Sequence, residues 1–244
     1  MNNQYGRSGK PWYISRRGAA LPLFVICVLV VAVQGTYTRA RGEKSLEQRI
    51  AQIKPRVHDK VEKMFFNAGC GFPGSSLSFL ALKKEKTLEV WCSKPDKKYS
   101  ILRKYRILAA SGGPGPKLKE GDRQVPEGIY KITWLHPNSS FHLSMKLNYP
   151  NELDKARAGE EGRKDLGGDI FIHGSFVSAG CLAMGDGPIE EIFYMTHVAG
   201  LKKSRVIIMP YDFRKNPPKA PDGAPKWTGD LYKTIDGHLA PFRS

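Results

Sequence analysis

With 244 residues, the chain has room for one domain of ordinary size and a tail, but it is short for two domains. Hydrophobic residues at 41% and charged residues at 25% argue against a chain that is disordered throughout. The formal net charge of +16 is unusual. A surface of this sign attracts nucleic acid, anionic lipid or a wall polymer with free carboxylates, or it simply keeps the protein soluble.

An export signal or membrane anchor is predicted first, over residues 1–38. The segment 18–33 (GAALPLFVICVLVVAV) carries no charge and follows Arg16 and Arg17. The uncharged stretch runs on to residue 38, and 21 helical residues reach roughly the 30 Å of a bilayer core. No small-x-small cleavage site follows, which favours an uncleaved anchor. The basic flank places the N-terminus in the cytoplasm and the remainder in the periplasm, or secreted if cleavage occurs.

Export puts Cys70, Cys92 and Cys181 in an oxidising compartment, whereas Cys27 lies within the apolar segment. Pairing Cys70 with Cys92 leaves Cys181 free, as suits a catalytic thiol. Other pairings, and a fully reduced chain, stay open at this point.

Residues 39–75 are predicted to hold a linker and an amphipathic helix from Ser45 to about Asn67. Ser45 and Gln48 match a capping box, apolar side chains follow helical spacing, and Gly69 ends the pattern. Pro55 within it predicts either a kink or a split into two helices.

Residues 76–212 are predicted to form one mostly β domain. Apolar runs bounded by Gly, Pro and Lys-rich turns predict strands over residues 77–82, 88–91, 99–110, 129–134, 141–147, 170–172 and 206–209. A helix is predicted over 188–199 after Cys181, with Pro188 in its first turn and Gly200 as its stop, and loops over 111–124 and 151–168. The pattern fits an α+β fold, mostly β with helices, arranged as a β-sandwich or open barrel.

The remaining residues, 213–244, form a proline-rich tail. Trp227, Leu231 and Tyr232 are predicted to dock it on the domain.

The segment 169–186 (DIFIHGSFVSAGCLAMGD) carries the candidate chemistry. His173 ends a strand and Cys181 follows eight residues later, after a turn of small residues. A thiol nucleophile needs a base within hydrogen-bond reach, and Gly180 lets the backbone approach a substrate. The spacing alone also fits a buried cysteine beside a hydrogen-bonded histidine. A metal site is disfavoured, because the other cysteines and histidines lack zinc-ligand spacing.

The strings IHG, SAGC and LAM, with an acid at Asp186, resemble the active-site segment of L,D-transpeptidases (the YkuD domain), in the compact YafK-like branch of murein enzymes. Upstream, residues 115–118 (GPKL), 118–132 (LKEGDRQVPEGIYKI) and 147–154 (LNYPNELD) resemble further elements of that branch in the same order. The likeness covers roughly residues 77–210.

This resemblance implies that Cys181 is the nucleophile and His173 its general base, with Ser178, Gly180 and Gly174 at the turn and oxyanion positions. Ala179 replaces a histidine and Ala183 an arginine that are common in the family. Other cations must therefore bind the substrate carboxylates. The candidates are Lys117, Lys119, Arg123 and Lys146, although each of them could equally be an ordinary surface charge.

The function implied is acyl transfer on peptidoglycan stem peptides, at the L-centre of meso-diaminopimelate, through a Cys181 thioester and without metal or organic cofactor. The acceptor stays open: a second diaminopimelate or a lipoprotein lysine gives a transpeptidase, and water gives a hydrolase that releases murein-linked lipoprotein. Expected partners are the stem peptides, murein-linked lipoprotein and the inner membrane. The alternative is a non-catalytic envelope-binding module on the same fold, and nucleic-acid binding lacks any motif and conflicts with export.

Overall fold

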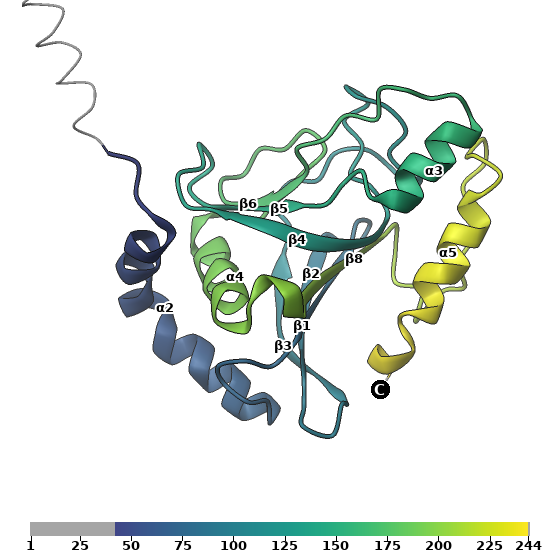
Figure 1. Cartoon of the computed structure of the whole chain (residues 1–244). Coiled ribbons are helices and arrows are strands. Elements are labelled where there is room, and N and C mark those ends of the chain that lie inside the picture. Colours follow the sequence, from purple (N-terminus) through teal and green to yellow (C-terminus); the bar gives the residue numbers. More distant parts are fainter. Residues whose placement is uncertain (1–41, 244) are drawn as a thin grey trace, which may run out of the picture. The chain divides into compact units, whose positions relative to one another are not determined.

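The computed structural model describes residues 42–243 (Figure 1). The predicted signal or anchor over residues 1–38, and Cys27 within it, lie outside the described residues. The chain divides into two units, Met1–Glu43 and Lys44–Ser244. No helix in the described part is long and apolar enough to cross a membrane.

Eight strands and four α-helices make up the part of the chain that the structure describes. The strands are β1 (Leu77–Leu82), β2 (Thr87–Ser93), β3 (Tyr99–Arg106), β4 (Gly128–His136), β5 (Ser144–Leu147), β6 (Phe171–His173), β7 (Leu182–Ala183) and β8 (Ser204–Met209). The helices are α2 (Leu46–Ala68), α3 (Glu152–Glu160), α4 (Asp186–Ala199) and α5 (Thr228–Gly237), with 3₁₀ turns at Leu201–Lys203 and Ala240–Phe242.

All eight strands join one mixed sheet in the order β3-β2-β1-β8-β4-β5-β6-β7. β1 pairs with β8, and β6 with β7, in parallel, whereas the other neighbours are antiparallel. The sheet twists so strongly that β4, β5 and β6 run across the direction of β1 and β2 (Figure 1). The expectation of a mostly β fold with helices is confirmed, and the single curved sheet corresponds to the open-barrel alternative.

Both faces of the central strands are covered, so β1 is buried along its whole length. Phe79 and Ala81 face a core that α2 and α4 complete, while Leu80 and Leu82 face a second core under the C-terminal tail. Strands buried on both faces show continuous apolar runs, which explains the LSFLAL sequence of β1. The tail thus lies on the sheet face opposite α2 and α4 (Figure 1).

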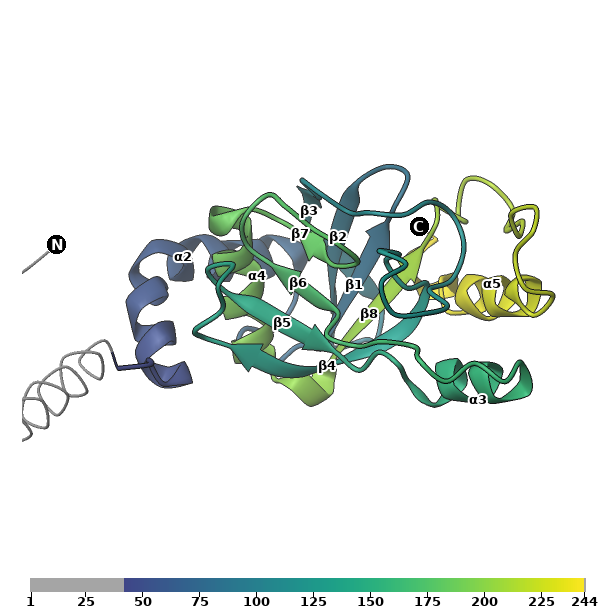
Figure 2. The same ribbon diagram turned by 90° about the horizontal axis from the view of Figure 1, so that it is seen from above.

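The first described helix follows its predicted capping. Ser45 and Gln48 form the capping box, and Gly69, with φ of 68°, caps the C-terminus. Pro55 lies inside a single helix, so the predicted split into two helices is wrong. The helix instead bends part of the way along, as Figure 1 and Figure 2 show, because proline removes one backbone hydrogen bond.

One prediction for the loops is wrong, and one short strand was not predicted. The segment 151–168 contains α3, which Asn151 and Asp154 start through a reciprocal capping box. Only Ala158 of this helix is buried, so no apolar periodicity marked it. The two-residue strand β7 was also missed.

Two predicted strands extend beyond the observed ones. The strand predicted over 99–110 ends at Arg106. The strand predicted to begin at Phe141 begins at Ser144 instead, because Phe141 is 42% exposed and His142 has a positive φ of 70°, a conformation that does not belong to a strand.

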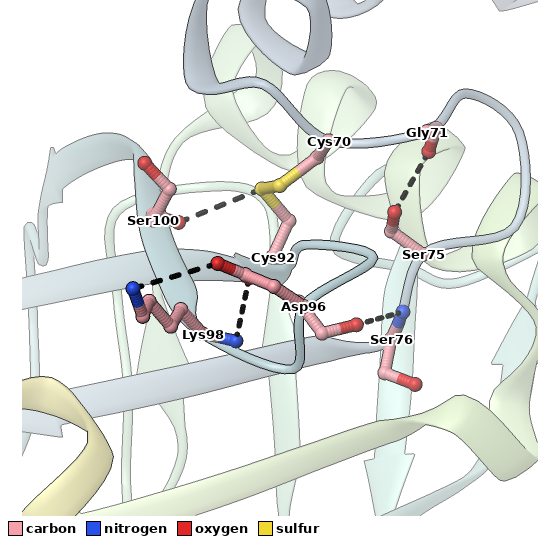
Figure 3. The surroundings of a disulfide bond; sticks show 9 residues. Cys70, Gly71, Ser75, Ser76, Cys92, Asp96, Lys98 and Ser100 are labelled. Atoms are coloured by element: carbon pink, nitrogen blue, oxygen red, sulfur yellow. Dashed lines mark hydrogen bonds and ion pairs between the residues drawn. A yellow bond between two sulfur atoms is a disulfide. The ribbon is translucent and has the colours of Figure 1, made fainter.

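Cys70 and Cys92 form a disulfide that ties the end of α2 to β2 (Figure 3). Cys92 Sγ also lies 3.5 Å from the carbonyl oxygen of Ser100 on the neighbouring strand. Among the described cysteines, Cys181 is the free thiol. The disulfide observed is therefore the Cys70–Cys92 pairing, one of those that the sequence left open, and it leaves Cys181 free.

Candidate active site

The two reactive side chains predicted from the sequence come from neighbouring strands. β6 and β7 pair in parallel with His173 opposite Ala183. Continuing this register backwards sets Cys181 opposite Phe171. Because side chains alternate along a strand, Cys181 and His173 belong to the same face. With strands about 4.8 Å apart and a rise of about 3.3 Å per residue, their Cα atoms are about 8 Å apart, within the joint reach of a thiol and an imidazole.

His173 is buried, with 2% of its surface exposed. Its Nδ1 lies 2.6 Å from the carbonyl oxygen of Gly174, which can only accept a hydrogen bond. Nδ1 therefore carries the proton, and in the neutral ring Nε2 keeps its lone pair. Burial lowers the pKa of His173 below its usual 6.5, although the Gly174 carbonyl acts in the opposite direction. Near neutral pH the ring is thus an uncharged base, and the ring of Phe141 packs on it at 4.6 Å between centroids.

Cys181 is partly exposed, and its Sγ sits in a backbone environment. The Phe171 N–H donates to Sγ at 3.4 Å, and Sγ lies 3.6 Å from the Asp169 carbonyl oxygen, which can accept the thiol proton. Burial raises the pKa of the Cys181 thiol above 9.0, against the smaller opposite effect of the Phe171 N–H. In this arrangement the thiol is neutral and bonds to backbone, not to His173.

Two serine hydroxyls hold the turn in front of the cysteine. Ser178 Oγ accepts from the Cys181 N–H at 3.0 Å and donates to the Cys181 carbonyl at 2.6 Å. Ser111 Oγ accepts from the Gly180 N–H at 2.7 Å and donates to the Arg123 carbonyl at 2.6 Å. Gly180 has φ of 95°, a conformation that favours glycine. The turn is therefore fixed both within itself and to the loop 111–125.

Gly174 sits where a larger residue does not fit. A Cβ at this position would lie 2.5 Å from the Phe141 carbonyl oxygen and 2.7 Å from Asp186 Oδ1. Its N–H donates to the Leu143 carbonyl at 3.0 Å, and the next N–H, of Ser175, donates to Asp186 Oδ1 at 2.8 Å. The close packing clamps the strand end that carries His173 against the start of α4.

The backbone N–H groups of Gly174, Gly180 and Cys181 all have protein acceptors. The sequence suggested that N–H groups around Cys181 form an oxyanion hole. In this structure these three donors hold the turn, and the predicted residues Gly174, Ser178 and Gly180 are brought together with His173 and Cys181 in that capacity.

The four candidate cations fall into two classes. Lys117 is buried and bonds to Asp122 at 2.6 Å, and Lys146 pairs with Asp169 at 2.7 Å, so both charges already have partners. Lys117 nevertheless acts on Cys181 electrostatically and lowers the pKa of the thiol slightly against the effect of burial. Lys119 and Arg123 are exposed and belong to the loop that contacts the cysteine turn.

Sequence reasoning missed two residues of the site. Ser111 is 69 residues from its partner Gly180, and Phe141 lies in a segment that reads as strand. Neither residue has a local sequence motif that marks it, because each reaches the site only when its segment folds against the segment 171–181. Within residues 42–243, no three or more His, Cys, Asp or Glu side chains gather as a metal site would require.

Comparisons with known proteins agree with the motifs. Residues 84–208 match the YkuD family, described as the L,D-transpeptidase catalytic domain. Over 144 residues the chain is 35% identical to YafK of Escherichia coli (strain K12), and the alignment covers 58% of this chain and 56% of YafK. The chain thus spans a little over half of that relative.

Solved structures of similar shape include the helical cell shape determining protein Pgp2 from Campylobacter jejuni, at 23% identity and a TM-score of 0.47, covering 64% of this chain and 57% of Pgp2. L,D-transpeptidase 1 of Mycobacterium tuberculosis is 16% identical with a TM-score of 0.32, covering 55% of this chain and 62% of that one.

Proposed function

Because the chain belongs to the L,D-transpeptidase catalytic domain family, we propose that it transfers acyl groups of peptidoglycan stem peptides with Cys181 as nucleophile and His173 as general base. The family resemblance drawn from the motifs is thereby confirmed, and membership supports a peptidoglycan-modifying enzyme. The observation that carries the residue assignment is the parallel pairing of β6 with β7, which sets the free thiol and a neutral, tautomer-fixed imidazole on one face.

The first step is thiol activation. The Gly174 carbonyl fixes the Nδ1–H tautomer, as the carboxylate does in a Ser-His-Asp triad, and leaves Nε2 as the base. The Cys181 side chain rotates away from the Asp169 carbonyl and passes its proton to Nε2 as it attacks. Since burial raises the pKa of the thiol and lowers that of the imidazole, this proton transfer accompanies attack and does not precede it as a resting ion pair.

The second step forms and resolves a thioester. The thiolate adds to the carbonyl at the L-centre of meso-diaminopimelate, and the amide C–N bond breaks as the imidazolium returns its proton to the departing amine. An incoming amine or water then loses a proton to His173 and attacks the thioester, which restores the Cys181 thiol. An amine of a second stem or of a lipoprotein lysine gives a cross-link or attachment, and water gives hydrolysis.

The tetrahedral oxygen needs a donor besides those that hold the turn. Ala179 directly precedes Gly180 and Cys181, whose N–H groups are bound by serine hydroxyls, and its own N–H makes no hydrogen bond with any residue in the range 42–243. We assign this N–H as an oxyanion donor, since unpaired backbone donors beside the nucleophile serve that role in acyl transfer. The Ala179 side chain is exposed, in keeping with a position at the mouth of the site.

The proposed location is the periplasm, with residues 1–38 as signal or inner-membrane anchor. The support is the basic flank ahead of an uncharged segment, together with the Cys70–Cys92 disulfide, since such bonds persist in oxidising compartments.

The test is mass spectrometry of purified sacculi incubated with the full chain in detergent. The wild type should yield cross-linked or shortened muropeptides, and the balance between them identifies the acceptor. Cys181→Ala should yield neither, and His173→Gln should lose about 10²–10⁴-fold in rate. His238→Ala, which removes an exposed histidine on the tail, is the matched control and should match the wild type. Conversion by Cys181→Ala at a rate near wild type would rule out the thioester route and leave the envelope-binding alternative.

A further inference from the structure

A cavity of about 590 Å³ opens at the beginning of β1 and β8, where β4 runs beside β8. Its charged lining residues are the cations Lys131, Lys202, Lys203 and Arg205, and no acidic side chain of the range 42–243 lines it. A cavity of this size is within the range of small-molecule sites, and walls that carry one sign of charge attract a ligand of the opposite sign.

The guanidinium of Arg205 is held in place within this cavity. Its central carbon lies 5.7 Å from the ring centroids of both Tyr99 and Phe242, and its Nε donates to Ser78 Oγ at 2.9 Å. The terminal N–H groups of this guanidinium make no hydrogen bond or ion pair with any residue of the described chain. Because the planar group is already oriented while these donors are unpaired, it is preorganised to bind an anion through two parallel hydrogen bonds.

A second cation, Lys131, lies directly opposite Arg205 on the antiparallel neighbour strand β4. Side chains in such a pair share one face of the sheet with Cβ atoms about 4.5–5.5 Å apart, and like charges there are destabilising. Among residues 42–243 the Lys131 ammonium has no ion-pair partner, so no acid lies between the two charges. By contrast, Lys104 on β3 lies opposite Glu89 and pairs with it at 3.0 Å.

The acidic side chains nearest to Lys131 and Arg205 line an adjoining groove, which these two cations also line. All three acids have other partners: Glu127 pairs with Lys83, Glu152 pairs with Lys155, and Asp154 caps α3. The repulsion between Lys131 and Arg205 is therefore not relieved from within the described chain. A bound anion would relieve it.

We propose that the Lys131–Arg205 pair, with Lys202 and Lys203 as further cations of the same cavity, binds a phosphate group, carried by a soluble phosphate or by a phospholipid head group. A phosphate has enough oxygens to bond to the arginine fork and to the Lys131 ammonium at once, whereas the fork alone occupies both oxygens of a carboxylate. Neither Cys181 nor His173 lines the cavity, so this binding is separate from the proposed acyl transfer.

The test follows thermal unfolding of the full chain in nonionic detergent, with inorganic phosphate or acetate added at equal ionic strength. Phosphate at about ten times its Kd should raise the melting temperature by about 3–6 °C, and acetate should raise it by less. Arg205→Gln should lose most of the phosphate-induced shift. Arg106→Gln, which removes an exposed arginine outside the cavity, is the matched control and should keep the shift.

Lys131→Gln separates ligand binding from support of the fold. Without phosphate it removes a like-charge contact and should raise the melting temperature by roughly 0.5–4 °C. With phosphate the variant should gain less than the wild type, because one of the two facing cations is missing. Lys84→Gln, an exposed lysine at the other end of β1, is its control and should respond to phosphate as the wild type does. A lysine that only supported the fold would lower the melting temperature under both conditions when replaced.

The source of the phosphate is distinguished by adding dihexanoyl-phosphatidylglycerol to the detergent. A larger Arg205-dependent shift with this lipid than with inorganic phosphate assigns the ligand to a lipid head group, and the reverse order assigns it to a soluble phosphate. Equal phosphate-induced shifts in Arg205→Gln and Arg106→Gln overturn the site. So do equal shifts from acetate and phosphate, or a lowered melting temperature of Lys131→Gln without phosphate.

Discussion

Replacing Tyr232 by Phe removes one oxygen atom from a buried ion-pair network between the tail and the sheet. Tyr232 OH lies 2.6 Å from Glu127 Oε2, and Lys83 Nζ lies 2.8 Å from Glu127 Oε1. The Glu127 side chain is fully buried, and Tyr232 is 1% exposed. Burial and the Glu127 charge raise the pKa of Tyr232, so its hydroxyl stays protonated and donates.

The expected loss follows from these contacts. Phe keeps the ring packing but leaves one oxygen of a buried carboxylate without its donor, which costs about 1.5–3 kcal/mol for a hydrogen bond to a charged group. For a folded region of about 200 residues, roughly 2–4 °C per kcal/mol gives a melting temperature lowered by roughly 3–12 °C. Differential scanning calorimetry on the full chain measures the shift.

The control is Tyr211→Phe. Tyr211 OH donates to the Pro217 carbonyl at 3.0 Å and accepts from the Lys219 N–H at 2.8 Å, both in an exposed setting, so water replaces both lost partners. This variant should shift the melting temperature by about 2 °C or less. If Tyr232→Phe unfolds no earlier than Tyr211→Phe, the buried network does not hold the tail to the sheet and the reasoning is refuted.

Three further results are expected. Ser111→Ala unpairs the Gly180 N–H and should lower kcat about tenfold or more in the sacculus assay, and a lower melting temperature with unchanged kcat would assign Ser111 to the fold alone. If His173 is the proposed neutral base, its lowered pKa means that activity should persist on acidification through pH 6.5 and fall only below it, and an acidic midpoint of kcat/KM above 6.5 would contradict the assignment. Because Cys70 and Cys92 are 22 residues apart in sequence, reduction of their disulfide should lower the free energy of unfolding in urea by about 3 kcal/mol, and equal curves with and without reductant would argue against the bond.

The sequence predicted elements best where local chemistry marks both ends. The capping box at Ser45 and the glycine at Gly69 bound α2, and the apolar run of β1 is flanked by polar residues. The helix α3 was not predicted, because its local signal is the Asn151–Asp154 cap and it buries only Ala158, which leaves no apolar periodicity. Strand β7 was not predicted, because two residues are too few to show any periodicity. It is recognised only by its pairing with β6.

For the site, motifs predicted residue identity but not the hydrogen bonds. The assignment of His173 and Cys181 came from their likeness to the active-site segment of L,D-transpeptidases, because their spacing alone fits a buried cysteine as well. The partner of each backbone N–H depends on which chain segment folds against the turn. The bond between Ser111 and the Gly180 N–H could not be predicted from sequence, because the isolated bridge between Ala109 and Ala183 is what brings the Ser111 loop beside the turn. Two N–H groups near the thiol, those of Gly180 and Cys181, bond to serine hydroxyls in this structure, and one of these hydroxyls comes from a distant loop.

The C-terminal tail covers one face of the central strands and also lines a cavity. A strand such as β1, buried on both faces, needs cover on both, and α2 with α4 supplies only one. Ile235, Leu239 and Phe242 cover the other face with almost no exposed surface, which contributes about 1.5–3 kcal/mol for each side chain. The preceding segment 221–225 lines one cavity together with residues of the loop 114–124. A substitution in this second core is therefore expected to disturb the position of segment 221–225 as well.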